Sequence, residues 1–144
     1  MKRNYPDRPI TAVGVVVIKG SEVLLIRRNK PPKSYLWSIP GGAQDLGEPL
    51  LKTAAREVLE ETGITIKNIT LLDAVDFIEC DEKDQIRFHY SLIDYGAEYE
   101  TGTLIAADDA LEAKWVSFDE LDHYNLWQET TEVIEKARVR LGPE

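Results

Sequence analysis

Residues 42–64 read GAQDLGEPLLKTAAREVLEETGI, a segment that combines helix signals with several carboxylates. Pro49 suits the start of a helix, because the fixed φ of proline is already helical and its missing N–H is not needed there. Gly63 suits the left-handed position that commonly ends a helix. The segment therefore predicts a helix from about Pro49 to Thr62.

The apolar and acidic side chains of this helix are expected to lie on opposite faces. One face would carry Leu51, Ala55, Val58, Leu59 and Thr62, and the other Glu57, Glu60 and Glu61. Glutamates three or four residues apart are neighbours on a helix, and each like-charged pair costs roughly 0.2–0.5 kcal/mol. Two interpretations follow: a solvated helix face, or carboxylates that converge on a hard divalent cation such as Mg²⁺, which prefers oxygen ligands.

The flanking sequence predicts a sheet and a second helix. Residues 10–18 are almost wholly apolar and rich in valine, which is typical of a strand buried on both faces. In chain order we expect strands at 10–18, 23–26, 64–79, 85–95 and 113–117, a loop at 29–34, an irregular acidic segment at 96–112, a short helix after Ser117, and a C-terminal helix marked by Leu126, Val133, Ala137 and Leu141. This order indicates one α/β or α+β domain over residues 1–144.

Charge and composition restrict the partners. The chain has 144 residues and a formal net charge of −9, which argues against long nucleic acid or a membrane surface as a partner. Residues 1–40 carry a net charge of +6 and residues 41–144 a net charge of −15, so a site shared by both parts would hold an anion beside a cation cluster. Cys80 is the only cysteine, which excludes an intrachain disulfide. With a polar N-terminus and no apolar run near ~20 residues, a cytoplasmic protein is expected.

The spacing within residues 42–64 resembles the Nudix box, G-x5-E-x7-R-E-U-x-E-E-x-G-U, where U is aliphatic. All nine defined positions are matched over 23 residues, a far more specific pattern than a lone glycine motif. Residues 23–28 and 37–42 are similar to the segments that precede the box in this family, and residues 113–121 to its late strand and short helix. The resemblance covers about residues 10–122.

The resemblance implies a Nudix-type α/β/α sandwich with a mixed central sheet. It also implies hydrolysis of a nucleoside diphosphate linked to another group, X, with Mg²⁺ or Mn²⁺. By position, Glu57, Glu60 and Glu61 match the carboxylates that bind the metal. Glu57 also matches the residue that orients or deprotonates the attacking water, and Glu60 is counted with it as catalytic.

The other residues of the box and its entrance take supporting roles in the family. Arg56 matches the arginine that holds a box glutamate in place, and Glu48 matches the outer glutamate, an additional metal residue in many members. A backbone carbonyl of Gly41 or Gly42 would supply one more metal ligand.

Candidates outside the box each have a structural alternative. Arg27 and Arg28 end a strand and are either solvent-facing or a phosphate clamp, with Arg28 preferred because the family often has a phosphate-contacting arginine there. Asp109 is the chosen late acidic residue, a metal ligand or general base, against a solvated acidic loop. The family more often has glutamate there, so the base stays unassigned. Trp37, Tyr90 and Trp127 could stack on a base, although aromatic side chains more often belong to the core.

The favoured function is metal-dependent hydrolysis of ADP-ribose or another nucleotide sugar, based on a general likeness around residues 94–95 and 108–115. One alternative is hydrolysis of a nucleoside triphosphate, ordinary or oxidised. Another is a Nudix-fold module that binds a nucleotide without turnover, although such modules usually lose a box carboxylate and here all are present. The expected partner is a small nucleotide. The oligomeric state is not readable from the sequence, and homodimers are common in the family.

Overall fold

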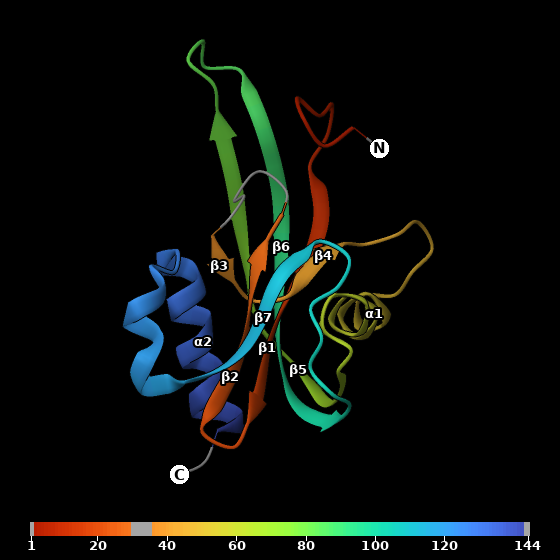
Figure 1. Ribbon diagram of the computed structural model, residues 1–144. Helices are drawn as coiled ribbons and strands as arrows, with labels where there is room; N and C mark the ends of the chain where they lie inside the picture. Colours follow the sequence, from red (N-terminus) through yellow and green to blue (C-terminus); the bar gives the residue numbers. More distant parts are fainter. Residues whose placement is uncertain (1, 30–35, 143–144) are drawn as a thin grey trace.

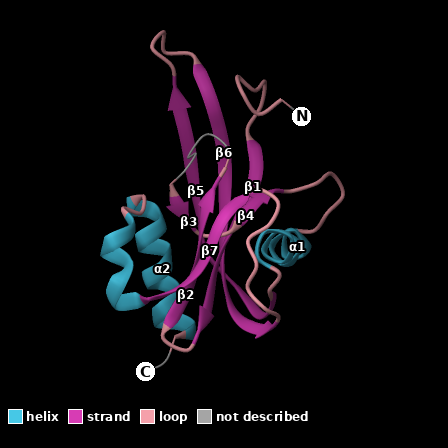
Figure 2. Ribbon diagram, in the orientation of Figure 1, coloured by secondary structure: helices cyan, strands magenta, loops and turns pink. Residues whose placement is uncertain are grey.

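A mixed sheet lies between two helices in the computed structural model, which describes residues 2–29 and 36–142 (Figure 1). Helix α1, Leu50–Thr62, covers one face of the sheet, and helix α2, Gln128–Leu141, covers the other (Figure 2). This arrangement confirms the predicted α/β/α sandwich. Most of the predicted loop at 29–34 lies outside the described residues. No helix in the described part of the chain is long and apolar enough to cross a membrane.

The sheet has seven strands. They are β1 Ile10–Lys19, β2 Glu22–Arg28, β3 Trp37–Ser38, β4 Gly41–Ala43, β5 Thr65–Cys80, β6 Ile86–Thr101 and β7 Ala110–Ser117. The main path runs β3-β2-β1-β6-β5, while β4 pairs with β1 and β7 with β2. Strands β1 and β6 are parallel and the other pairs are antiparallel. The short helix η1, Phe118–Tyr124, links β7 to α2.

The prediction of an irregular segment at 96–112 was wrong at both ends. Strand β6 continues to Thr101, and β7 already begins at Ala110. The sequence 96–101 has little apolar alternation, but it is flanked on both sides by strands. Because β1 pairs with β6 as far as Glu98 and β5 pairs with it as far as Thr101, its backbone groups are satisfied as a strand.

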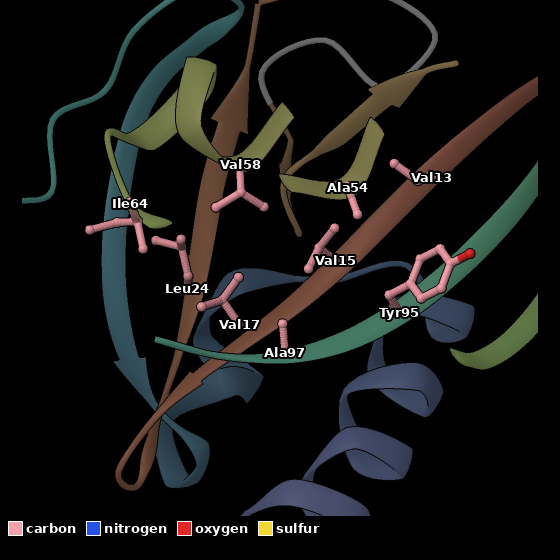
Figure 3. Packing of buried hydrophobic residues seen from close by; sticks show 9 residues of the cluster. All are labelled: Val13, Val15, Val17, Leu24, Ala54, Val58, Ile64, Tyr95 and Ala97. Carbon is pink, nitrogen blue, oxygen red and sulfur yellow. The ribbon is translucent and has the colours of Figure 1, made fainter. Parts of the chain in front are cut away.

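Strand β1 supplies the core on both faces of the sheet. Val13, Val15 and Val17 pack with Ala54 and Val58 of α1 (Figure 3). The alternate residues, including Val16 and Ile18, pack with the buried face of α2. A strand covered by a helix on each side has no polar face, which explains the nearly continuous apolar run at 10–18.

Helix α1 does not divide into the predicted apolar and acidic faces. Leu51 and Leu59 are 53% and 50% exposed, and Ala55 is also exposed. Glu57 and Glu61 are instead buried, together with Thr53, Ala54, Val58 and Thr62. The prediction of opposite faces assumed that the carboxylates point toward water. Here β4 receives two of the carboxylates instead, because the Gly41 N–H bonds Glu61 and the absence of a side chain at Gly42 leaves room for Glu57.

The ends of α1 agree with the sequence. Pro49 is the N-cap residue, and Gly63 ends the helix with φ 74°, its N–H donating to the Leu59 carbonyl at 2.9 Å. A Cβ at Gly63 would also lie 3.0 Å from the Thr103 carbonyl oxygen. Both the positive φ and the close contact therefore require glycine at this position.

We predict that Gly63→Ala lowers the free energy of unfolding by roughly 2 kcal/mol, since backbone strain and a steric contact act together. Gly20→Ala is the matched control, because Gly20 has φ 61° but a Cβ there would meet no atom within 4 Å. It should cost about 1 kcal/mol from strain alone. Urea unfolding of both variants gives the difference, and equal costs would contradict the role of the Thr103 contact.

Candidate active site

The backbone of β4 brings two carboxylates of α1 against the sheet. The Gly41 N–H donates to Glu61 Oε1 at 2.8 Å. A Cβ at Gly42 would lie only 2.5–2.7 Å from the carboxyl atoms of Glu57, and a Cβ at Gly41 would lie 2.0 Å from the Val13 carbonyl oxygen. The two glycines are therefore needed for space, since α1 and β1 both approach β4 too closely for a side chain.

Glu61 is an incompletely satisfied buried acid. Its side chain is fully buried, and Oε2 has no hydrogen-bond partner in the described structure. Burial raises the pKa of Glu61 to about 8, against the opposing effects of Arg28 and the Gly41 N–H. The negative charges of Glu57 and Asp109 raise it further. An acid in this state either carries a proton or needs a cation at its second oxygen.

Arg56 holds three glutamates at once. Its Nε and Nη2 donate to the two carboxylate oxygens of Glu48 at 2.6 and 2.9 Å, and Thr53 Oγ1 adds a bond of 2.7 Å. These hydrogen bonds lower the pKa of Glu48 to about 2, and those from Arg56 have the largest effect. Arg56 Nη1 donates to Glu57 Oε1 at 2.9 Å and to Glu60 Oε2 at 3.2 Å. Burial raises the pKa of Glu57, and Arg56 offsets part of that effect.

The donor set suits a hard cation, although the donors are not preassembled. In residues 2–29 and 36–142, no three acidic, histidine or cysteine side chains stand close enough to form a metal site. Arg56 Nη1 bonds one oxygen of Glu57 and one oxygen of Glu60, and it makes no bond to the second oxygen of either carboxylate. The partnerless Glu61 Oε2 and the surrounding carboxylates are oxygen donors of the kind that Mg²⁺ and Mn²⁺ accept. The chemistry of these residues therefore fits such an ion.

Of the two glycine carbonyls, the strand pairing favours Gly41 as a ligand. Two hydrogen bonds join β1 to the segment around β4: the Val15 N–H donates to Pro40 O, and the Gln44 N–H donates to Thr11 O. The Val13–Gly42 pair lies midway between them, two residues from each. In an antiparallel pair of strands, hydrogen-bonded residue pairs alternate with pairs that are not hydrogen-bonded. Gly42 therefore belongs to a hydrogen-bonded pair with Val13, whereas the N–H and carbonyl of Gly41 do not bond to β1. The Gly41 N–H, which bonds Glu61 rather than β1, agrees with that pattern.

The two arginines of β2 lie in different surroundings. Arg28 lines a cleft beside Gly41 and Gly42, and its charge acts on both Glu57 and Glu61. Arg27 does not line this cleft, and its Nε lies 2.8 Å from Glu112 Oε2 on β7. The bulge between Arg27 and Arg28 in the pairing with β7 accompanies this separation.

Asp109 comes close to the carboxylates through the loop between β6 and β7. The Ile105 and Ala107 N–H groups donate to the Thr62 and Glu61 carbonyls at 3.0 Å, so the loop is fastened to the C-terminal end of α1. The Asp109 carbonyl in turn accepts from the Asn29 N–H, next to Arg28, at 2.9 Å. The structure thus gathers Asp109, Arg28 and the buried glutamates, whereas Arg27 stands apart.

The cleft beyond β4 has aromatic walls that include the candidates Tyr90 and Trp127, and it also contains Phe77 and two acidic groups for which the sequence provided no functional expectation. Phe77 stands edge-on to Trp127 with ring centroids 5.5 Å apart, and its centroid lies 6.5 Å from that of Tyr90. Asp94 and Glu129 also line the cleft, which encloses about 900 Å³, part of it open to solvent. His89 and Trp37 are not among its lining residues.

A signal for Asp94 was present in the sequence. The apolar alternation at positions 86, 88, 90 and 92 continues onto position 94, which places a carboxylate on the inward face of β6. Asp94 is 6% exposed, and a Cβ on the facing Gly14 would lie 2.6 Å from its Oδ1. Glu129 had no such signal, because its position depends on how α2 packs across the sheet.

We predict that Gly42→Ala destabilises the chain by about 1–3 kcal/mol, because the new methyl group displaces the Glu57 carboxylate. The same substitution in a Glu57→Ala background removes the obstacle and should cost less than about 0.5 kcal/mol. Urea unfolding of the four proteins of this cycle measures the coupling. Equal costs in both backgrounds would show that Gly42 is required for another reason.

The titration of Glu61 should appear in the stability of the metal-free protein. Its pKa is raised from 4.5 to about 8, so folding favours the protonated acid. The stabilisation is complete below about pH 4.5 and is lost as the pH rises through 8. The stability of the wild type should therefore fall relative to Glu61→Gln over this range, as measured by urea unfolding in chelator. A constant difference between the two proteins would contradict the shift.

Comparison with known proteins places this geometry in a family. The model of the NUDIX domain matches residues 8–137. An ADP-ribose pyrophosphatase of Methanocaldococcus jannaschii is 32% identical over 113 residues, which are 78% of this chain and 64% of that protein. An NAD-capped RNA hydrolase NudC of Mannheimia succiniciproducens is 29% identical over 124 residues, 81% of this chain and 43% of that protein. The chain thus spans less than two thirds of the length of both relatives.

A solved structure agrees with the sequence match. The crystal structure of a MutT NUDIX hydrolase from Burkholderia pseudomallei superposes with a TM-score of 0.78 at 27% identity, covering 90% of this chain and 98% of that one. The family model spans the sheet, α1 with its clustered glutamates and most of α2, and this chain belongs to the Nudix family.

Proposed function

We propose that this chain hydrolyses the diphosphate bond of a nucleoside diphosphate linked to a second group, with ADP-ribose or a related nucleotide sugar as the substrate. The observation that carries the proposal is the gathering of Glu57, Glu60 and Glu61 around Arg56 and Gly41, at the end of a cleft with an arginine and aromatic walls. A diphosphate would lie between these carboxylates and Arg28.

The residues that would hold Mg²⁺ or Mn²⁺ are Glu57, Glu60, Glu61, the Gly41 carbonyl and, from the outer position, Glu48. When bound, the ion supplies positive charge that offsets the diphosphate and acidifies water near neutral pH. The buried Glu61 contributes an oxygen that no group of the described chain satisfies. Arg56 positions Glu48 and the helix carboxylates, and its charge limits their mutual repulsion.

The protein supplies position and charge for the reaction. Glu57 is the candidate to orient and deprotonate the attacking water, because its carboxylate is buried beside Gly42 and burial raises its pKa toward the range of a useful base. Asp109 is the second candidate, on the loop fastened to α1. Arg28 would neutralise a phosphate oxygen, a role for which Arg27 is less suited because it pairs with Glu112.

The choice of substrate rests on two relatives. Their names refer to ADP-ribose and to an NAD cap on RNA, and both compounds contain an adenosine diphosphate joined to a further group. The aromatic cleft next to the carboxylates offers a place for the base. A nucleoside triphosphate remains the alternative substrate, and nucleotide binding without turnover the alternative function.

The test is product analysis with Mg²⁺ and a panel of ADP-ribose, NAD, other nucleotide sugars and nucleoside triphosphates, including oxidised ones. We expect AMP from at least one diphosphate-linked compound. Glu57→Gln and Glu60→Gln should each lower kcat on the order of 10²-fold or more while the protein stays folded. Glu120→Gln, on the exposed surface of η1, is the matched control and should keep full activity.

Full activity in both variants, or in excess chelator, would refute the metal-dependent mechanism. Turnover of nucleoside triphosphates alone would select the alternative substrate. Tight nucleotide binding with no turnover of any compound would identify a binding module.

A further inference from the structure

Two charged side chains, the exposed Arg3 and the half-buried Glu129, line the aromatic cleft. Glu129 lies in the first turn of α2, and its Oε2 is shielded from solvent with no hydrogen-bond partner among the described residues. Arg3 lines the same cleft and forms no ion pair within residues 2–29 and 36–142. A shielded acceptor left unpaired costs free energy, which a ligand with a suitable donor would recover. Arg3 and Glu129 line the same cleft without forming an ion pair with each other, so one ligand could contact both side chains.

The two residues that follow Arg3 fasten the segment that precedes β1 to the rest of the molecule. The Tyr5 N–H donates to the Arg87 carbonyl at 2.8 Å, and Tyr5 Oη donates to Asp81 Oδ2 at 2.9 Å. Arg87 Nε donates to Asn4 Oδ1 at 3.1 Å. These bonds fasten the segment to the long β5–β6 hairpin, which projects beyond the helices near the N-terminus (Figure 1). Arg3 is therefore adjacent to an anchored part of the chain.

The same cleft has aromatic surfaces on which a flat ring can stack. Trp127, Phe77 and Tyr90 contribute aromatic surfaces, with Trp127 and Phe77 at an interplanar angle of 83°. Nucleobases stack on such surfaces with little dependence on which base is present. Discrimination between bases must therefore come from polar side chains of the cleft. Of these, Glu129 has an oxygen with no partner among the described residues, and Arg3 forms no ion pair with them.

We propose that Arg3 and Glu129 together recognise the hydrogen-bonding edge of an amino-substituted base, with Glu129 accepting from the exocyclic amine and Arg3 donating to a ring nitrogen. Adenine presents such an edge, an amine donor beside a ring-nitrogen acceptor. Hypoxanthine carries a carbonyl in place of the amine and would set an acceptor against the Glu129 carboxylate. The inference rests on the proposed function, since the base is part of the proposed substrate.

The experiment is calorimetric binding of AMP and IMP, which differ at the amine, without metal and without turnover. The wild type should bind AMP about tenfold more tightly than IMP, the value of one hydrogen bond to a charged group. Glu129→Gln should lose this preference, because an amide can donate to a carbonyl as well as accept from an amine. Arg3→Ala should weaken AMP binding about fivefold or more.

Matched controls lie on the same elements but outside the cleft. Glu132→Gln changes an exposed carboxylate one turn along α2, and Arg8→Ala removes an exposed arginine near β1. Both should bind AMP and IMP as the wild type does. Thermal unfolding of each variant checks that α2 remains folded.

The outcomes separate the hypotheses. Equal binding of AMP and IMP by the wild type, retained preference in Glu129→Gln, or no binding of either nucleotide would overturn the proposal. Binding of adenosine, which lacks the phosphate, is a further test. If Arg3→Ala weakens the binding of AMP but not of adenosine, Arg3 contacts the phosphate and its assignment to the base is wrong. Selective AMP binding without hydrolysis of any substrate would refute the proposed function and leave this inference standing.

Discussion

The hydrogen bond from the Gly41 N–H to Glu61, made where no water reaches the carboxylate, is the contact around which the rest of the site is arranged. To make it, α1 must lie directly on β4, and β4 must carry no side chains at Gly41 and Gly42. The approach buries Glu57 as well and leaves Leu51 and Leu59 exposed, while Leu50 packs against the core. A helix packed for its apolar area alone would have turned the other way.

Burying these acids costs stability that the core of the molecule has to offset. The charged form of Glu61 is disfavoured by burial, and the cluster would repel itself without Arg56. The valine-rich strand β1, packed on both faces, and the capped α1 helix provide the rigid frame that holds the cluster in place. Groups kept in an unfavourable state by their surroundings are typical of functional sites, because a ligand can relieve the cost.

Along α1 and β6, local sequence preferences and long-range contacts decide different features. The bounds of α1 followed from Pro49 and Gly63, whose backbone preferences are local. The orientation of the helix could not be predicted in the same way. The prediction placed side chains by their polarity alone, and it did not include the Gly41 N–H as a partner for a buried carboxylate. Likewise, the end of β6 at Thr101 depends on pairing with β5, a contact between residues far apart in the sequence.

The sequence by itself determined the family through nine positions of the box, and the helical repeat placed the carboxylates of residues 57–61 near one another. It did so because side chains three and four residues apart on a helix necessarily share a surface. Only the tertiary structure decided which of them are buried, that Arg28 rather than Arg27 faces the cleft, and that Arg3, Asp94 and Glu129 line it together. These three come from the N-terminal segment, β6 and α2, and only the packing of distant segments brings them to one place.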